Sequence, residues 1–233
     1  MSEIREARLQ KAIKLVQKGF DSYAESFRVS HNTKFLIKKF DYLENGQEEN
    51  FSISIAGRVM AKRVMGKIAF FTISDQDGQI QLYLDKKIIN CSLDKQKLLS
   101  FEDIKEIVDI GDWIGVYGTI KKTNKGELSI KVEKWEMLSK SLQPLPDKWH
   151  GLTDIEKRYR QRYLDLIVNP NSKNVFKTRA KCISFIRKWL DNRNFLEIET
   201  PILQSEAGGA EARPFITHHN TLDIPLYLRI ATE

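Results

Sequence analysis

The chain has 233 residues, of which 41% are hydrophobic and 30% are charged, and its formal net charge is +7. It has no apolar run near the roughly 20 residues that a membrane-spanning helix needs, and its charged N-terminal segment does not resemble a secretory signal peptide. The cysteines Cys91 and Cys182 are too few for a disulfide framework or a zinc cluster. These features predict a cytoplasmic protein without a bound metal, and the basic balance weakly favours a polyanionic partner such as nucleic acid.

Residues 1–50 are predicted to form an N-terminal helical extension. A second, shorter helix within it is expected at about residues 34–44. Lysines and arginines occupy the other face of the first helix, so two interpretations stay open: a helix packed on its neighbour, or a basic arm that touches RNA phosphates. The first helix is predicted from an apolar stripe at helical spacing, formed by Leu9, Ile13, Val16 and Phe20.

Residues 51–140 change to a period of two, which is typical of strands. Three strands, a helix and two further strands are expected, and the last two are joined by a turn at Asn124-Lys125-Gly126. This order predicts an OB-fold, an all-β barrel of five strands whose face often binds single-stranded nucleic acid. A five-stranded barrel without a ligand is the alternative. The expected strands are 51–59, 67–74, 79–84, 112–123 and 127–138, and the expected helix is 94–108.

A connector with two prolines and a glycine is predicted at residues 141–154, and an α+β arrangement follows it at 155–233. The apolar stripe of the long helix consists of Phe176, Ile183, Ile186 and Leu190. The elements expected after the connector are a basic helix at 155–168, the long helix at 172–192, and strands at 195–201, 214–219 and 227–233.

Several barrel residues are of the types that bind RNA. Phe70 and Phe71 are neighbours on a strand and must face opposite sides, so one can be core while the other is free for a base. Stacking one base on an aromatic ring is worth about 1–3 kcal/mol. Arg63 and Gln81 lie on the neighbouring strands, although such residues more often serve packing. The pair His218-His219 is not expected to hold a metal, because adjacent strand residues point in opposite directions.

Four stretches together resemble the class II lysyl-tRNA synthetases. They are GRVMAKRVMGKIAFFTISDQDGQIQLY, LPDKWHGLTDIEKRYRQRYLDLI, FLEIETP and GGAEARPFITHHNTLDIPLYLRIATE, and the resemblance covers about residues 51–233. RYLDL and EIETP also occur in the aspartyl and asparaginyl relatives, whereas the run from Gly208 to Glu233 is specific to the lysyl family.

The resemblance implies roles for matching residues. In the barrel, Phe70 would stack on an anticodon base, Arg63 and Gln81 would read the middle uridine, and Glu127 would contact a neighbouring anticodon base. In the second part, the lysine α-amino group would be held by the carbonyl of Gly209 and the carboxylate of Glu233. Pro201 and the helix before it would form a homodimer contact.

The implied fold is the OB-fold barrel with N-terminal helices, followed by the start of an α+β class II catalytic domain with an incomplete antiparallel sheet. The implied activity is the ligation of lysine to tRNA(Lys), with ATP as a substrate and Mg²⁺ as a cofactor, and with neither DNA nor membrane as a partner. The family's motifs 2 and 3 have no counterpart in this sequence, so the chain is expected to be an N-terminal fragment, without catalytic residues of its own and inactive alone. A non-catalytic tRNA-binding protein that retains the barrel is the alternative.

Overall fold

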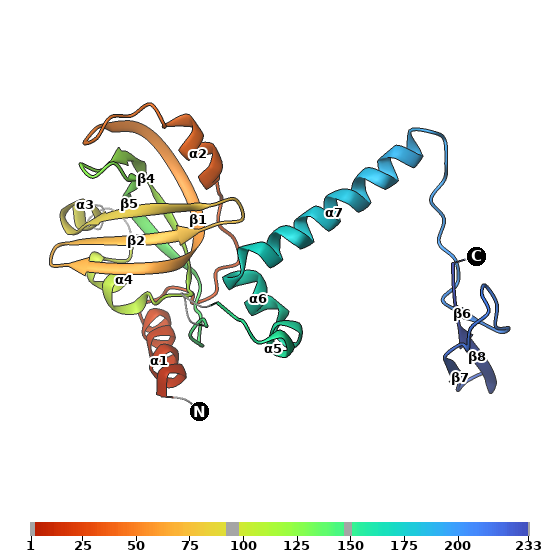
Figure 1. Cartoon of the computed structure of the whole chain (residues 1–233). Helices are drawn as coiled ribbons and strands as arrows, with labels where there is room; N and C mark the ends of the chain where they lie inside the picture. The colour runs from red at the N-terminus through yellow and green to blue at the C-terminus, as the bar shows by residue number, and fades with distance from the viewer. Residues whose placement is uncertain (1–2, 92–97, 147–150, 233) are drawn as a thin grey trace. The chain divides into compact units, whose positions relative to one another are not determined.

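The computed structural model describes residues 3–91, 98–146 and 151–232. The chain divides into two compact units, Met1–Arg160 and Gln161–Glu233, each described by itself below (Figure 1). None of the helices in these described ranges is long and apolar enough to cross a membrane.

The first unit is built on a closed barrel with the strand order β1-β2-β3-β5-β4. All neighbouring strands are antiparallel except β3 and β5, which are parallel. The five-stranded barrel predicted from the sequence is therefore confirmed, with helices between the third and fourth strands as expected. Its strands are β1 (Glu48–Met65), β2 (Ile68–Ser74), β3 (Gln79–Asp85), β4 (Trp113–Lys122) and β5 (Leu128–Ser139).

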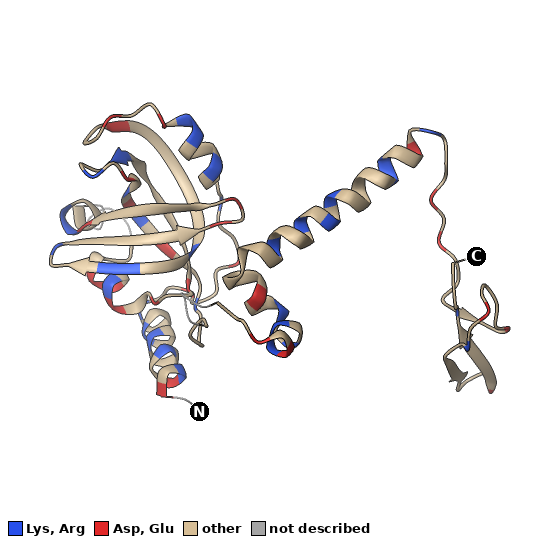
Figure 2. Ribbon diagram, in the orientation of Figure 1, with Lys and Arg blue, Asp and Glu red and all other residues tan. Residues whose placement is uncertain are grey.

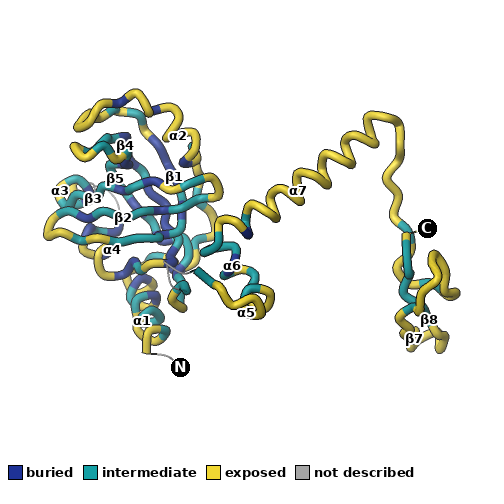
Figure 3. The backbone as a smooth tube through the Cα atoms, viewed as in Figure 1, coloured by how far each residue is buried: buried dark blue, intermediate teal, exposed yellow. Residues whose placement is uncertain are grey.

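Strict alternation of side chains produces the barrel core. Along β2 and β3 every second residue is buried, including Phe71 and Leu82, while the residues between them face outward. Figure 3 shows the buried residues concentrated in these strands. At Gly118, where the β4–β5 register shifts, a side chain would collide with the carbonyl oxygen of Lys131, so the close approach of the two backbones requires glycine.

Five helices accompany the barrel in the described ranges, and they only partly match the prediction. The helix expected at 94–108 is represented by α4, which begins at Phe101, and residues 92–97 lie outside the described residues. The helix expected at about 34–44 is represented by α2, which is shorter and ends at Lys39. The bounds are α1 (Glu3–Gln17), α2 (Thr33–Lys39), α3 (Lys86–Cys91), α4 (Phe101–Ile107) and α5 (Ile155–Arg160).

The apolar stripe predicted for α1 is only partly correct. Ala12 and Leu15 are the buried residues of this helix, whereas Ile13 and Val16 are exposed. The packed side contributes Leu15 to the core, and it also carries ion pairs from α1 and from Lys18 just after it to carboxylates of α4 and of the segment that follows α4. The pairs are Lys11–Asp109, Lys14–Glu106 and Lys18–Asp103.

A capping box begins α4. The Ser100 hydroxyl accepts a bond from the Asp103 backbone N–H at 3.1 Å, and the Asp103 carboxylate accepts a bond from the Ser100 backbone N–H at 3.0 Å. Burial opposes ionisation of Asp103, but the bonds from Lys18 and Ser100 outweigh it and hold the pKa of this carboxyl below its ordinary value.

Replacing Ser100 with alanine is expected to lower the free energy of unfolding by about 1 kcal/mol, because the first turn of α4 loses its cap. Urea unfolding followed by circular dichroism measures this loss. Ser52→Ala, at an exposed position of β1, is the matched control and should change the free energy by less than about 0.5 kcal/mol. Equal effects from the two variants would contradict the proposed role of the cap.

A buried ionic cluster ties the end of β5 to the segment after α4. The Lys140 ammonium donates to the Asp112 carboxylate at 2.7 Å, the Asp109 carboxylate at 2.6 Å and the Ile107 carbonyl at 2.7 Å. The side chains of Lys140 and Asp112 are both 0% exposed. The other Asp112 oxygen accepts the Ser141 backbone N–H at 2.8 Å, so the pair is fully bonded on both sides.

The second unit begins with a helical corner. Asp165 on α6 is buried and accepts bonds from Asn169 at 2.7 Å and Ser172 at 3.0 Å, which fixes the break at Pro170. Figure 1 shows α7 as one uninterrupted helix, and its predicted apolar stripe is exposed along its length (Figure 3). A small sheet with the order β6-β8-β7 follows. The bounds are α6 (Arg162–Val168), α7 (Pro170–Asp191), β6 (Leu203–Gln204), β7 (Ile216–His219) and β8 (Ile224–Leu228).

Two strand predictions in this unit are wrong. Residues 195–201 form no strand, and Leu196 and Ile198 on this segment are 88% and 77% exposed. The closing strand, predicted at 227–233, is β8 at Ile224–Leu228; residues 229–232 form no strand, and residue 233 lies outside the described residues. In both cases the ladder partner is missing: within the described ranges, β8 pairs with β6 and β7 only up to Leu228, and no strand pairs with 195–201. An alternating pattern forms a strand only where another strand bonds to it.

Candidate functional site

The outward faces of β1, β2, β3 and β5 form one continuous surface of the barrel. In the ladder register Arg63 lies opposite Phe70, Phe70 lies opposite Tyr83, and Gln81 lies opposite Ser129. Residues opposite one another have Cβ atoms about 4.5–5.5 Å apart. Gln81 also lies opposite Thr72, two residues along β3 from Tyr83, so it is a diagonal neighbour of Phe70. The strand pairing therefore places Arg63 directly beside Phe70 and Gln81 diagonally from it, and these are three of the residues that the sequence singled out.

The two phenylalanines of β2 divide as alternation requires. Phe71 is 0% exposed in the core, and Phe70 lies on the outer surface. The Phe70 ring meets Tyr83 edge to face, with 5.6 Å between ring centroids and 66° between ring planes. This contact fixes the Phe70 ring, which is partly exposed on the outer surface.

Gln81 and Glu127 provide hydrogen-bonding groups on the same side. The Gln81 side-chain oxygen accepts a bond from the Ser129 hydroxyl at 2.9 Å, which orients the amide. Glu127 lies in the β4–β5 turn, where its backbone N–H donates to the Thr123 hydroxyl at 3.0 Å and its carbonyl accepts the Thr123 N–H at 2.9 Å. The Glu127 carboxylate is exposed, so the turn presents it to solvent in a fixed backbone geometry.

The sequence interpretation missed Tyr83 and the charges around it. The Lys121 ammonium lies 4.8 Å from the centroid of the Tyr83 ring, and the Glu48 carboxylate bonds to both Lys121 and Lys131. These two lysines hold the pKa of Glu48 below its ordinary value. The signal for Tyr83 was present, because the period of two in QIQLYLD places it on the face of Gln81.

Lys62, the neighbour of Arg63, serves the fold and not this surface. Its ammonium donates to the Val108 carbonyl at 2.6 Å and to the Lys105 carbonyl at 2.7 Å, so it closes the C-terminal end of α4. Burial is the main reason that the pKa of Lys62 is lowered. Adjacent basic residues on one strand therefore have separate tasks.

In the second unit, the loop that carries Gly209 lies against the segment after β8. Gly209 has a φ of +101°, and a side chain there would come within 3.3 Å of the Ala231 backbone nitrogen. Ala231 stands two residues before Glu233 in the sequence, and Glu233 itself lies outside the described residues. Pro201 is exposed at the end of the extended segment after α7.

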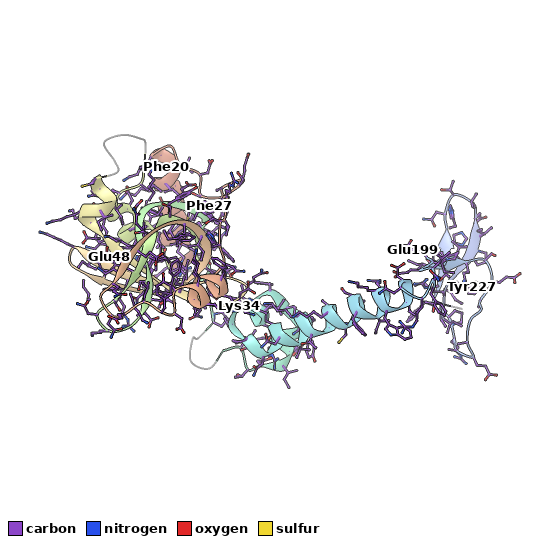
Figure 4. All side chains as sticks on the ribbon, turned by 90° about the horizontal axis from the view of Figure 1, so that it is seen from above. Phe20, Phe27, Lys34, Glu48, Glu199 and Tyr227 are labelled. Atoms are coloured by element: carbon purple, nitrogen blue, oxygen red, sulfur yellow. The ribbon has the colours of Figure 1, made fainter. Side chains whose placement is uncertain are left out.

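A groove of about 520 Å³ is lined by Ile198, Glu199, Thr200, Ile202, Arg229 and Thr232, of which Figure 4 labels Glu199. Arg229 donates to the Thr200 carbonyl at 2.9 Å and to the Thr200 hydroxyl at 2.7 Å. The two histidines of β7 bond within their own hairpin, His218 to the Asp223 carboxylate and His219 to the Leu222 N–H.

Two family models match separate parts of the chain. The model described as OB-fold nucleic acid binding domain matches residues 53–138, and the model described as tRNA synthetases class II (D, K and N) matches residues 154–233. The first coincides with the barrel and the second covers the helical corner, α7 and the small sheet. They confirm the predicted fold class, a barrel followed by the start of a class II domain.

Several proteins with high sequence identity to this chain are named lysine–tRNA ligase. The chain is 93% identical to the lysine–tRNA ligase of Prochlorococcus marinus (strain MIT 9301) and 92% identical to that of strain MIT 9312, each over 233 residues. It is 61% identical to the lysine–tRNA ligase of Synechococcus sp. (strain CC9902) over 233 residues. In each case the whole of this chain aligns with 46% of the relative, so the chain spans about half the length of the curated relatives it matches. Identity at this level over every residue of both units shows that the chain belongs to the family of class II lysyl-tRNA synthetases.

Proposed function

We propose that the outer face of the barrel binds the anticodon of tRNA(Lys), within a protein that ligates lysine to this tRNA. The observation that carries the proposal is the ladder register, which sets Arg63 opposite Phe70 and places Gln81 diagonally from Phe70, two residues along β3 from Tyr83. This group of an arginine fork, a ring and an amide offers each unstacked base a face to stack on and donors for its edge.

Each side chain has a distinct part in this proposal. Phe70 stacks on one base, and Arg63 and Gln81 donate to the carbonyl groups of the middle uridine. Glu127 accepts a hydrogen bond from a neighbouring base, because an ionised carboxylate is an acceptor only. Tyr83 joins them as a positioning residue that holds the Phe70 ring by its edge.

For the second unit we propose that the Gly209 carbonyl and the Glu233 carboxylate hold the α-amino group of lysine. The approach of the Gly209 loop to Ala231 supports this, because it brings the two segments together. In the proposed reaction the lysine carboxylate attacks the α-phosphate of ATP and pyrophosphate leaves, and the aminoacyl group then passes to the 3′-terminal ribose of the tRNA with release of AMP. Among the described residues no three His, Cys, Asp or Glu side chains gather to hold a metal ion, so no residue here is assigned to Mg²⁺.

The exposed stripe of α7 supports a second proposal, a homodimer contact formed by this helix together with Pro201. Phe176, Ile183 and Ile186 are each at least 40% exposed. A contiguous apolar face of this kind marks an interaction surface. The proposed location of the protein is the cytoplasm, where its tRNA partner is found.

The anticodon proposal is tested with two RNA stem-loops that differ at one base. One carries the lysine anticodon, and the other has cytidine in place of the middle uridine, which replaces a carbonyl acceptor with an amino donor. The chain is expected to bind the first about 5- to 150-fold more tightly, since a donor left without its acceptor costs about 1–3 kcal/mol. Fluorescence anisotropy measures both affinities. Equal affinities would contradict the assigned roles of Arg63 and Gln81.

A further inference from the structure

Helix α2 closes one end of the barrel. Its first residue, Thr33, donates from its backbone N–H and its hydroxyl to the Asp75 carboxylate, both at 2.8 Å, and Asn32 caps it by accepting the Phe35 N–H at 2.8 Å. Leu36 and Phe40 are fully buried beneath it. The helix is therefore fixed on the β2–β3 turn and cannot move independently of the barrel.

The same end of the barrel carries the turn that holds Glu127. The Lys122 ammonium donates to the Leu43 carbonyl at 2.7 Å, and the Gly46 N–H donates to the Lys122 carbonyl at 3.0 Å, so the segment after α2 is bonded to the β4–β5 turn. Along β2, Phe70 lies four residues before Ser74, or about 13 Å from the turn that seats α2. An RNA bound on the outer face therefore has α2 within close reach.

A cluster of rings fixes the exposed side of α2. The Lys39 ammonium lies 3.6 Å from the centroid of the Phe51 ring, and His31 stacks on Phe35 with 4.9 Å between ring centroids. These contacts engage the Lys39 ammonium and the rings of Phe51, His31 and Phe35. They leave two lysines on the helix, Lys34 and Lys38, with their charged ends in solvent.

Lys34 and Lys38 are the unneutralised charges of this region. They lie one helical turn apart, and neither forms an ion pair within the described ranges of the chain. Two like charges at this spacing slightly destabilise a helix. Helix α1 differs, because its two lysines, Lys11 and Lys14, are paired with carboxylates, as is Lys18 just after it. Figure 2 shows basic residues and no acidic residue on α2, and Figure 4 labels Lys34 there.

We propose that Lys34 and Lys38 form a second RNA contact, which binds phosphates of the stem that follows the anticodon loop. The proposal rests on the anticodon site proposed above and extends it beyond residues 53–138, which match the OB-fold model. Ammonium groups are point charges that pair with phosphate oxygens without reading the base sequence. The arm that touches RNA is then α2 and not α1, whose lysines are engaged in holding the fold.

The test compares two double variants of the chain. Lys34→Gln with Lys38→Gln removes the proposed contact. Lys87→Gln with Lys105→Gln removes the same charge from exposed positions on α3 and α4. These two helices lie between β3 and β4 in the chain. Each protein is titrated over a range of salt concentrations with two RNAs: the lysine-anticodon stem-loop and the isolated loop oligonucleotide. Thermal unfolding checks that both variants are folded.

The expected result is a change in the salt dependence of binding. Each phosphate contact to a duplex contributes about 0.9 to the slope of log K against log salt, so the α2 variant should lose about 1.8 from the slope for the stem-loop. The loop oligonucleotide should show no such loss, and neither should the control variant. A slope equal to that of the unsubstituted chain, or an equal loss with both RNAs, would overturn the stem contact and leave the anticodon site standing. If the unsubstituted chain binds neither RNA, the anticodon site itself is refuted and this contact with it.

Discussion

Replacing Phe70 with alanine is expected to weaken binding of the lysine-anticodon stem-loop by about 1–3 kcal/mol, which is about 5- to 150-fold in Kd. The Phe70 ring is at the surface while its neighbour Phe71 fills the core, so the loss reflects stacking and not collapse of the barrel. Fluorescence anisotropy with the labelled stem-loop measures the change. The slope of affinity against salt should stay the same, because a ring neutralises no phosphate.

Two further substitutions make this result specific. Phe70→Trp keeps an aromatic face and should retain most of the affinity. Phe215→Ala removes an exposed ring from the second unit and should leave the affinity unchanged. If Phe70→Ala binds the stem-loop as tightly as the unsubstituted chain, the ring serves only to pack against Tyr83, and the stacking role is wrong.

Replacing Lys140 with methionine is expected to lower the free energy of unfolding by about 3–5 kcal/mol. Methionine is long enough to fill the space of the lysine stem, but it leaves the carboxylate of Asp112 buried without its ammonium partner. The neighbouring carboxylate of Asp109 keeps its pairing with Lys11, so the damage centres on Asp112. Urea unfolding of the barrel, followed by tryptophan fluorescence, measures the loss.

The matched control for Lys140 is Lys105→Met, at an exposed position of α4, which should change the free energy of unfolding by less than about 0.5 kcal/mol. The double variant Lys140→Met with Asp112→Leu removes both buried charges and should be more stable than Lys140→Met alone. A loss below about 1 kcal/mol for Lys140→Met would mean that Asp112 takes up a proton or meets water at little cost.

The barrel was predictable because its signal is local. A period of two specifies an inward and an outward face before any strand is paired, which is why the sides of Phe70 and Phe71 follow from the sequence. The same period places Tyr83 beside Gln81, so this neighbour was also within reach of the sequence. What alternation does not give is the register, and the register alone sets Arg63 opposite Phe70.

The incorrect predictions concern elements whose structure depends on contacts with segments far away in the sequence. In α1 the face that packs adds Leu15 to the core and bonds to carboxylates almost a hundred residues away, such as Asp109 for Lys11, and helical spacing carries no information about these partners. The segment 195–201 alternates like a strand, yet a strand needs a ladder that this chain does not provide in its described ranges. Lys62 and Arg63 look equivalent in the sequence, and only the position of the α4 carbonyls distinguishes them.

Glu48 gives the barrel face a resident counter-ion. Its carboxylate already balances Lys121 and Lys131 beside Tyr83, so an RNA phosphate arriving there would exchange one anion for another. Such an exchange adds little binding free energy for an arbitrary polyanion. An RNA that also stacks on Phe70 and bonds to Gln81 gains its binding free energy from those contacts, so the exchange does not weaken it. In this way one acidic side chain on a basic protein would favour selective binding over indiscriminate adhesion.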